Sequence, residues 1–323
     1  MSTPRARVTI LRALGLGDLL AVVPALRGLA EGLGGPHHEL LLVTPHGLAP
    51  LVALTPGPAG RLLRVAGSDV LRSLPDAARG AELAVNLHGK GPESHRLLAG
   101  SGCRRLLAFR HRDVPESAGG PAWDPGEHEV DRWCRLVRHA GFDADPARLD
   151  LLRPPGADEH PLAGATVVHP GAASPSRRWP AERFASVARS EAAAGRRVVV
   201  TGGPHEELLV RQVSTAAGLP SSAALAGRTS VAELAEIVAA AARVVCGDTG
   251  VGHLATAFGT PSVVVFGPTP PTVWGPPPAR SDRHRVVWSG RAGDPHAPSA
   301  DPGLLEITPE RVLRELEELP AAV

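Results

Sequence analysis

Residues 244–277, VVCGDTGVGHLATAFGTPSVVVFGPTPPTVWGPP, constrain the fold of this chain more than any other stretch. An apolar run predicts a buried strand, a glycine-rich polar turn follows it, and small residues continue as a helix before a second apolar strand and a proline-rich loop. A strand that turns through glycines into a helix directs backbone N–H groups and the positive end of the helix at one point. The segment therefore predicts a phosphate or diphosphate site, with Asp248 and His253 beside the turn.

Short apolar runs alternate with helical patterns in the first half of the chain. The runs that begin at Arg7, His38 and Leu83 have the composition of buried strands, and a helical pattern at 19–33 follows the first of them. The proline- and charge-rich segment at 142–164 predicts a linker.

A second series of strand and helix patterns begins at residue 165. It ends in a loop-like tail at 278–303 and the amphipathic helix TPERVLRELEEL. Two such series predict an α/β fold with two Rossmann-like, parallel-sheet domains facing a cleft. The expected divisions are residues 1–155, 156–305 and a closing helix at 306–323.

The composition excludes several classes of protein. With 43% hydrophobic and 21% charged residues, the 323-residue chain can bury real cores and is not disordered. A formal net charge of +1 gives no electrostatic case for nucleic-acid binding. Cys103, Cys134 and Cys246 form neither a metal motif nor a disulfide framework, which favours a reducing cytoplasm. Charged residues interrupt the apolar stretch at 11–33, so neither a signal peptide nor a membrane span is predicted.

Several blocks of the sequence resemble glycosyltransferase family 9, whose best-known members are the lipopolysaccharide heptosyltransferases. In chain order the blocks are LGLGDLLAVVPALRGL from Leu14, HPGAASPSRRWPAERF from His169, VVTGGPHEE from Val199, LAGRTSVAELAEIVAAA from Leu225, DTGVGH from Asp248, GTP from Gly259 and FGPTPPTVWGPP from Phe266. The resemblance implies two Rossmann-like halves of the GT-B type, the acceptor on the first, the nucleotide-sugar on the second, and the last helix packing back on the first half.

The resemblance also implies an inverting, metal-independent glycosyltransferase that needs no cofactor. It would move a sugar from a nucleoside-diphosphate donor, ADP-linked heptose being favoured, to a hydroxyl of a glycan, lipid-linked or small-molecule acceptor. A peripheral contact with the inner face of a membrane stays open, because some relatives use lipid-linked acceptors. Two alternatives also stay open: a nucleotide-sugar 2-epimerase of similar fold, and a nucleotide-sugar-binding protein without catalysis.

The segment GLGDLL places Asp18 at the start of the first helix. It begins like the dinucleotide-binding fingerprint G-x-G-x-x-G, but Leu20 occupies the position of the third glycine. A dinucleotide-binding site of that type is therefore not predicted. Gly17 still permits close approach of a polar group and is an expected acceptor contact. Asp18 by itself suits a helix N-cap. The resemblance makes it the general base that removes the proton of the acceptor hydroxyl.

The donor half holds further candidates. The resemblance places Arg177 on the donor diphosphate, although the family usually has lysine there. His169 follows a strand at its carboxyl end, where open parallel sheets bind ligands, and Ser174 adds a hydroxyl. Glu206 and Glu207 open a helix; the resemblance implies that one of them holds the ribose hydroxyls, and spacing does not choose between them.

Roles within the DTGVGH turn follow from chemistry. Thr249, the N–H groups of Gly250 and Val251, and His253 are expected on diphosphate oxygens. Asp248 repels phosphate, so it is expected to orient sugar hydroxyls or hold the loop, and capping the helix is its alternative role.

In the first half, NLHGKGPESHRL places His88, Lys90 and His95 after a strand. The resemblance makes them acceptor contacts, and an ordinary basic surface loop is the alternative. Asp143 and Asp145 match the D-x-D pattern of metal-dependent glycosyltransferases. They lie in the expected linker, where aspartates beside proline are typical of turns, so no metal site is predicted.

Overall fold

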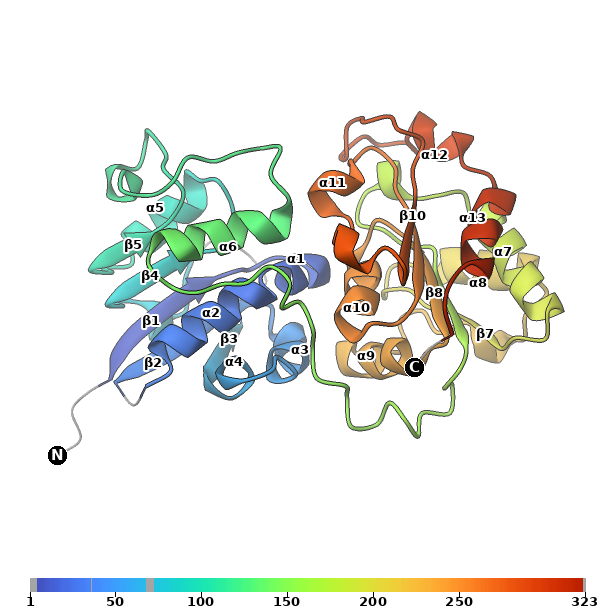
Figure 1. Ribbon diagram of the computed structural model, residues 1–323, viewed down its shortest axis with the longest axis horizontal. Coiled ribbons are helices and arrows are strands. Elements are labelled where there is room, and N and C mark those ends of the chain that lie inside the picture. Colours follow the sequence, from blue (N-terminus) through green and yellow to red (C-terminus); the bar gives the residue numbers. More distant parts are fainter. Residues whose placement is uncertain (1–4, 36, 68–72, 322–323) are drawn as a thin grey trace. The chain divides into compact units, whose positions relative to one another are not determined.

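The computed structural model describes residues 5–35, 37–67 and 73–321. The chain divides into two compact units, Met1–Leu152 and Arg153–Val323. This boundary falls inside the segment that the sequence predicts as a linker. Each unit is an α/β layer structure around one parallel sheet (Figure 1).

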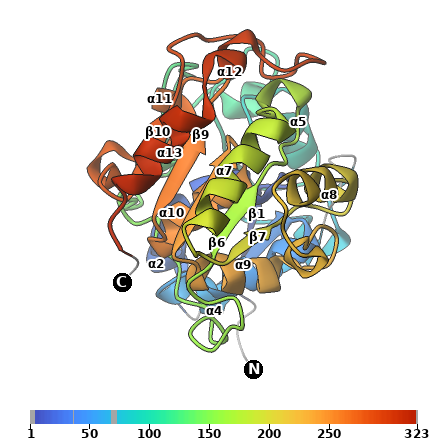
Figure 2. The ribbon, with the colours of Figure 1, turned by 90° about the vertical axis from the view of Figure 1, so that its right-hand side faces the viewer.

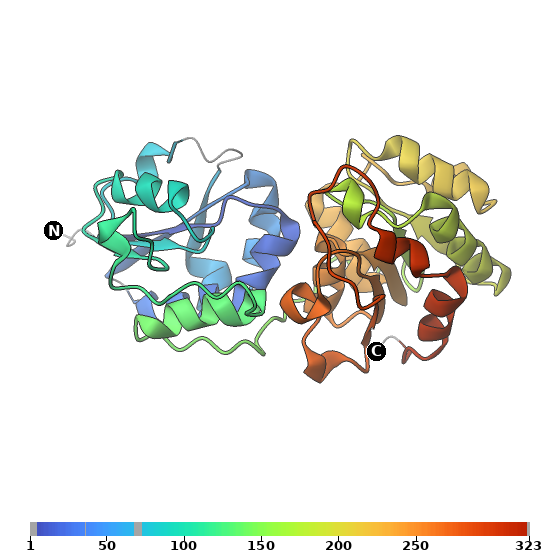
Figure 3. The same ribbon diagram turned by 90° about the horizontal axis from the view of Figure 1, so that it is seen from above.

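The first unit holds a five-stranded parallel sheet in the order β3-β2-β1-β4-β5. Its strands and helices, in chain order, are β1 (Ala6–Leu11), α1 (Leu16–Ala21), α2 (Val23–Leu33), β2 (His38–Thr44), α3 (Ala49–Ala53), α4 (Pro58–Leu62), β3 (Leu63–Gly67), β4 (Leu83–Asn86), α5 (Glu93–Ala99), β5 (Arg105–Leu107) and α6 (Glu129–His139). Figure 3 shows α5, in teal, and α6, in green, on opposite faces of this sheet.

Two local features shape the first unit. The predicted helix at 19–33 is interrupted at Val22, between α1 and α2. Pro24 explains the break, because proline supplies no N–H for a continuous helix and is favoured in the first turn of a new one. Gly28 of α2 lies against the main-chain carbonyl of Asp143, and a Cβ there would overlap that oxygen. Glycine therefore lets α2 pack closely beside the end of α6.

The second unit also holds a five-stranded parallel sheet, in the order β10-β9-β8-β6-β7. Its strands and helices are β6 (Thr166–His169), α7 (Ala181–Ala193), β7 (Val198–Val200), α8 (Glu207–Ala216), α9 (Val231–Ala240), β8 (Arg243–Gly247), α10 (Gly250–Phe258), β9 (Ser262–Val265), α11 (Pro271–Trp274), β10 (His284–Val287), α12 (Pro302–Glu306) and α13 (Pro309–Glu317). The strand, turn, helix and strand predicted around the DTGVGH turn are confirmed.

The C-terminal part of the chain differs from the sequence expectation in one way. The tail at 278–303 is not all loop, because HRVV forms the edge strand β10 beside β9. The closing helix α13 packs on α7 and the strands of the second sheet, as Figure 2 shows. Its apolar stripe, Val312 and Leu316, is fully buried in the core of that unit. That stripe is thereby used within the second unit.

The strand orders define a switch point in each sheet, where chain connections leave in opposite directions. In the first unit it lies between β1 and β4, where Leu11 pairs with Asn86. In the second it lies between β6 and β8, where His169 pairs with Cys246. Ligands of open α/β sheets bind at the carboxyl ends of strands at such points. The segments carrying Asp18 and His88, and those carrying Arg177 and Asp248, follow these four strands.

Candidate functional site

The turn after β8 presents the beginning of α10. Thr249 is the N-cap residue, with extended φ and ψ of −154° and 166°, and its side chain makes no capping hydrogen bond. Asp248 lies one position earlier, so its alternative role as a cap is not observed. The first backbone N–H groups of a helix have no partner within it, so Gly250 and Val251 offer two donors beside the Thr249 hydroxyl.

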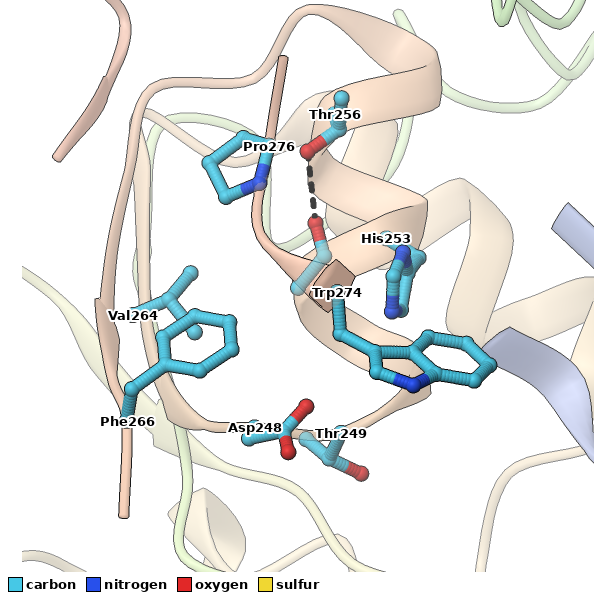
Figure 4. Close-up of a pocket in the computed structure, with 9 residues that line it drawn as sticks. Asp248, Thr249, His253, Thr256, Val264, Phe266, Trp274 and Pro276 are labelled. Atoms are coloured by element: carbon cyan, nitrogen blue, oxygen red, sulfur yellow. Dashed lines mark hydrogen bonds between the residues drawn. The ribbon is translucent and has the colours of Figure 1, made fainter. Parts of the chain in front are cut away.

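A small pocket lies against this turn (Figure 4). Residues of the turn, of α10, of β9 and of the following loop line it: Asp248, Thr249, Gly252, His253, Thr256, Val264, Phe266, Trp274 and Pro276. The Trp274 ring meets the His253 ring edge-on, with 5.8 Å between centroids. The sequence motif contains Phe266 and Trp274, yet reasoning from the sequence gave neither a role. The sequence signal for Trp274 is a tryptophan within a proline-rich segment that follows the predicted phosphate-binding motif.

Arg177 reaches the same turn from the loop after β6. Its Nη1 atom lies 3.7 Å from Oδ2 of Asp248, whose side chain is only 6% exposed. Burial raises the pKa of the Asp248 carboxyl, and the positive charge of Arg177 opposes that shift. Nε of Arg177 is buried and has no hydrogen-bond partner in the described part of the chain. The turn therefore combines a cation, a buried carboxylate and helix N–H groups.

Glu206 and Glu207 point to different surroundings. Oε2 of Glu206 accepts a hydrogen bond of 2.8 Å from the Gly203 N–H and lies 4.0 Å from Nε2 of His169. A Cβ on Gly171 would overlap the Glu206 carboxylate, so a larger residue there would displace that carboxylate. Glu207 is 59% exposed and pairs with Arg211 one helical turn on. Glu206 alone of the two thus faces the carboxyl end of β6.

His169 and Ser174 are both buried. Nδ1 of His169 lies 2.9 Å from the Thr201 hydroxyl, and burial lowers the pKa of this histidine, so the ring is neutral at pH 7. The Ser174 hydroxyl lies 2.9 Å from that of Ser176, which donates to a main-chain carbonyl. These contacts shape the loop that carries Arg177.

In the first unit, Asp18 lies in the first turn of α1 and does not cap it; the cap position is Gly15. Oδ1 of Asp18 is 3.2 Å from Nη2 of Arg12, and Nε of Arg12 donates to the Asp18 main-chain carbonyl at 2.9 Å. The Asp18 side chain is 31% exposed, whereas that of Arg12 is 1% exposed. The buried Arg12 guanidinium therefore holds one oxygen of the Asp18 carboxylate, while part of the carboxylate is exposed to solvent. Gly17 precedes it in the same turn.

His88 lies beside this pair. Burial and the positive charge of Arg12 lower the pKa of His88 to about 4, against a smaller opposite effect of Asp18. Its Nδ1 atom is buried without a hydrogen-bond partner among residues 5–35, 37–67 and 73–321. A neutral imidazole next to Asp18 suits a polar ligand. Lys90, two residues on, is exposed.

The expectation that His95 contacts an acceptor is wrong. His95 is fully buried, Nδ1 lies 2.8 Å from the Asn86 amide nitrogen, and Nε2 lies 2.7 Å from the Phe109 carbonyl. The amide can only donate and the carbonyl can only accept, so the ring is the neutral Nε2–H tautomer. Both ring nitrogens are used inside the fold because α5 turns this face toward β4.

The D-x-D pattern has turn geometry. Oδ1 of Asp145 accepts a hydrogen bond of 3.0 Å from the Ala147 N–H. In the part of the chain that the structure describes, no group of three or more His, Cys, Asp or Glu side chains could hold a metal ion. Within the same described residues, no helix is long and apolar enough to cross a membrane.

Comparison with known proteins identifies the family to which the chain belongs. Residues 121–300, more than half of the chain, match the sequence profile of glycosyltransferase family 9 (heptosyltransferase). The chain belongs to glycosyltransferase family 9. The strand–turn–helix at α10 and the loops with Arg177 and Glu206 all lie in the matched region.

Curated relatives are lipopolysaccharide heptosyltransferases. The chain is 32% identical to lipopolysaccharide heptosyltransferase 2 of Salmonella typhimurium over 171 residues, which cover 50% of this chain and 48% of that protein. It thus spans about half the length of that relative. Identity to lipopolysaccharide heptosyltransferase 1 of Pseudomonas aeruginosa is 29% over 294 residues, covering 82% of this chain and 79% of that one.

Solved structures show the same fold. The E. coli ADP-heptose lipopolysaccharide heptosyltransferase II superimposes with a TM-score of 0.74 at 19% identity, covering 96% and 97% of the two chains. A dodecameric, iron-containing heptosyltransferase, TibC of enterotoxigenic E. coli, in complex with ADP-D-β-D-heptose gives a TM-score of 0.62 at 14% identity, covering 97% and 76% of the two chains. These matches establish the GT-B fold class that the sequence predicts.

Proposed function

We propose that this chain transfers a sugar from a nucleoside-diphosphate donor, with ADP-linked heptose favoured, to a hydroxyl of a glycan acceptor of the lipopolysaccharide type. The proposal rests on one observation: the Arg177 guanidinium reaches the turn before α10, where its Nη1 atom lies 3.7 Å from Oδ2 of Asp248. A diphosphate there would accept from the N–H groups of Gly250 and Val251 and from the Thr249 hydroxyl. Family membership supports this role.

In the second unit, different residues bind the diphosphate, the ribose and the sugar of the donor. Arg177 and the helix N-terminus stabilise the negative charge that develops on the departing diphosphate. Glu206 takes the ribose hydroxyls, because its carboxylate is held inward by Gly203 whereas Glu207 faces solvent. Asp248 faces the sugar, where its acceptor oxygens suit hydroxyl groups. His253 completes the diphosphate contacts, and His169 and Ser174 line the adjoining loop.

Asp18 serves as the general base in this proposal. It removes the proton of the acceptor hydroxyl while the oxygen attacks the anomeric carbon, and the carbon–diphosphate bond breaks on the opposite face. The configuration is therefore inverted in one step. His88, Lys90 and Gly17 contact the acceptor. Peripheral contact with the inner face of a membrane would follow if that acceptor is lipid-linked, with the enzyme in the cytoplasm.

Metal independence is part of the proposal and rests on Arg177. Its guanidinium supplies the positive charge that a bound cation supplies in other transferases. Among the relatives one heptosyltransferase is iron-containing, so this point needs a direct test.

The test is a thermal-shift panel with ADP, UDP, GDP and dTDP, each with EDTA or with Mg²⁺. A ligand at 100 times its dissociation constant stabilises the folded state by about 2.7 kcal/mol. The proposal expects ADP to raise Tm equally with EDTA and with Mg²⁺. Stabilisation by UDP alone would favour the epimerase alternative, and stabilisation only with Mg²⁺ would contradict the assigned diphosphate site.

A further inference from the structure

Asp18 belongs to a cluster of four charged side chains in the first unit. Arg12 and Arg132 carry the positive charges and Glu129 and Asp18 the negative ones. The side chains of Arg12, Arg132 and Glu129 are 1%, 4% and 7% exposed, so three of the four charges are buried. Only Asp18, at 31%, reaches solvent.

Arg12 is the centre of this cluster. Nη1 donates to the Leu87 carbonyl at 2.6 Å, and Nε donates to the Asp18 carbonyl. Nη2 lies 3.2 Å from both Oδ1 of Asp18 and Oε1 of Glu129. The guanidinium lies over the Trp133 ring, 4.9 Å from its centroid. These contacts bind the ends of β1 and β4 and the start of α1 to one planar group.

Glu129 fixes the direction of that group from the first residue of α6. Oε1 accepts from Nε1 of Trp133 at 2.8 Å as well as facing Arg12, and Oε2 pairs with Arg132. Without this carboxylate, Nη2 of Arg12 would have Asp18 as its single anionic partner in the cluster. Nε and Nη1 would keep their main-chain partners, but Nη2, the atom that contacts the Asp18 carboxylate, would lose the second anion that fixes its direction.

We propose that Glu129 is a positioning residue for the transfer reaction, acting through Arg12 to hold the Asp18 carboxylate toward the acceptor. Arg12 engages Oδ1, and in the described part of the chain no hydrogen bond engages Oδ2, which is therefore the oxygen presented to the acceptor hydroxyl. This inference rests on the proposed role of Asp18 as base. Glu129 itself touches no substrate.

The first readout is independent of activity. The Nε–H signal of Arg12, assigned by its loss in Arg12→Lys, should exchange slowly with water because that group is buried and bonded to Asp18. In Glu129→Gln the signal should move and exchange at least about 10-fold faster, since one anchor of the guanidinium is gone. An unchanged Arg12 signal in Glu129→Gln would overturn the inference.

The matched control is Glu127→Gln. Glu127 precedes the same helix, is 16% exposed and pairs with Arg135 at 2.7 Å, and among the described residues no hydrogen bond or ion pair joins it to Arg12. Its main-chain carbonyl accepts from Arg132, a contact that a change of side chain leaves in place. It removes one ion pair of similar geometry and should leave the Arg12 signal unchanged. A change of equal size in this control would mean general loosening of α6 and would also refute the inference.

The second readout is the pH profile of transfer from ADP-heptose to heptose-deficient lipopolysaccharide. In Glu129→Gln, kcat should fall about 10-fold with donor KM within twofold. The acid limb should move to lower pH by roughly half to one unit, because a negative charge near Asp18 is removed. Glu129→Asp keeps the charge and should keep the limb in place. Loss of kcat without movement of the limb would show a merely structural role.

Trp133→Phe provides a second route if Glu129→Gln folds poorly. It retains the ring beneath Arg12 and removes the hydrogen bond to Oε1, so it should produce smaller changes in the same directions. A wild-type protein without turnover would contradict the proposed function, while the Arg12 signal would still decide whether Glu129 positions Asp18.

Discussion

The assignment of the ribose site to Glu206 can be tested by replacing Glu206 with Gln, which removes the charge and keeps the shape. In the structure Oε2 accepts from Gly203 at 2.8 Å, and no hydrogen bond among the described residues uses Oε1. Hydrogen bonds to a charged group contribute about 1.5–3 kcal/mol each. The Gln amide oxygen can still accept a neutral hydrogen bond worth about 0.5–1.5 kcal/mol, so the loss is about 1–1.5 kcal/mol. Removing the charge at one ribose contact therefore predicts roughly 5- to 13-fold weaker ADP binding.

Calorimetric titration with ADP and with 2′,3′-dideoxy-ADP separates this contact from general damage. The loss in Glu206→Gln should be seen with ADP and should largely vanish with the dideoxy analogue, which has no hydroxyls to bind. Glu207→Gln is the matched control; its side chain is 59% exposed and should leave ADP affinity within twofold. Equal losses for both nucleotides, or a larger loss in Glu207→Gln, would refute the assignment.

Three further predictions concern other sites. Asp18→Asn should lower kcat/KM at least 100-fold and leave ADP affinity unchanged in the same titration, because the base acts on the acceptor; retained turnover would exclude that role. Arg177→Ala should weaken ADP binding at least 10-fold, with Arg177→Lys intermediate; unchanged affinity would remove Arg177 from the diphosphate site. Buried His284 has its pKa lowered to about 4 by burial, so the unfolded state binds the proton first as pH falls. His284 should account for about 3 kcal/mol of the stability that urea unfolding shows to be lost between pH 6.5 and 4, and His284→Asn should make that loss smaller.

The part of the site that lies within one contiguous motif could be predicted from the sequence. The strand, turn and helix around Asp248 follow from apolar runs, glycines and small residues, and all of them are local signals. The motif GLGDLL likewise places Asp18 at the start of the first helix, whereas its role as base is what the family resemblance implies. The structure adds that Gly15 is the N-cap of α1, which removes capping as the explanation of this aspartate.

The rest depends on contacts between distant residues. Arg12 and Glu129 are 117 positions apart, and nothing in either segment indicates that the two charges are buried together. The prediction of His95 as an acceptor contact rests on its place after a strand and on the family resemblance, which puts the acceptor on the first half. Its real partners, Asn86 and the Phe109 carbonyl, become apparent only when β4, α5 and the segment after β5 are packed.

The short edge strand β10 was missed for a related reason. Four residues with two half-buried positions carry too little hydrophobic signal to stand out from a loop. The choice between Glu206 and Glu207 likewise needed three-dimensional information, because adjacent residues at a helix start share every local property except direction.

The most direct test of the proposed activity is transfer from ADP-heptose to heptose-deficient lipopolysaccharide in the presence of EDTA, followed by NMR of the new linkage. The account predicts release of ADP in step with heptose incorporation, and an anomeric configuration opposite to that of the donor. Retention of configuration, or turnover that appears only when a divalent metal is restored, would contradict a one-step displacement supported by Asp18 and Arg177.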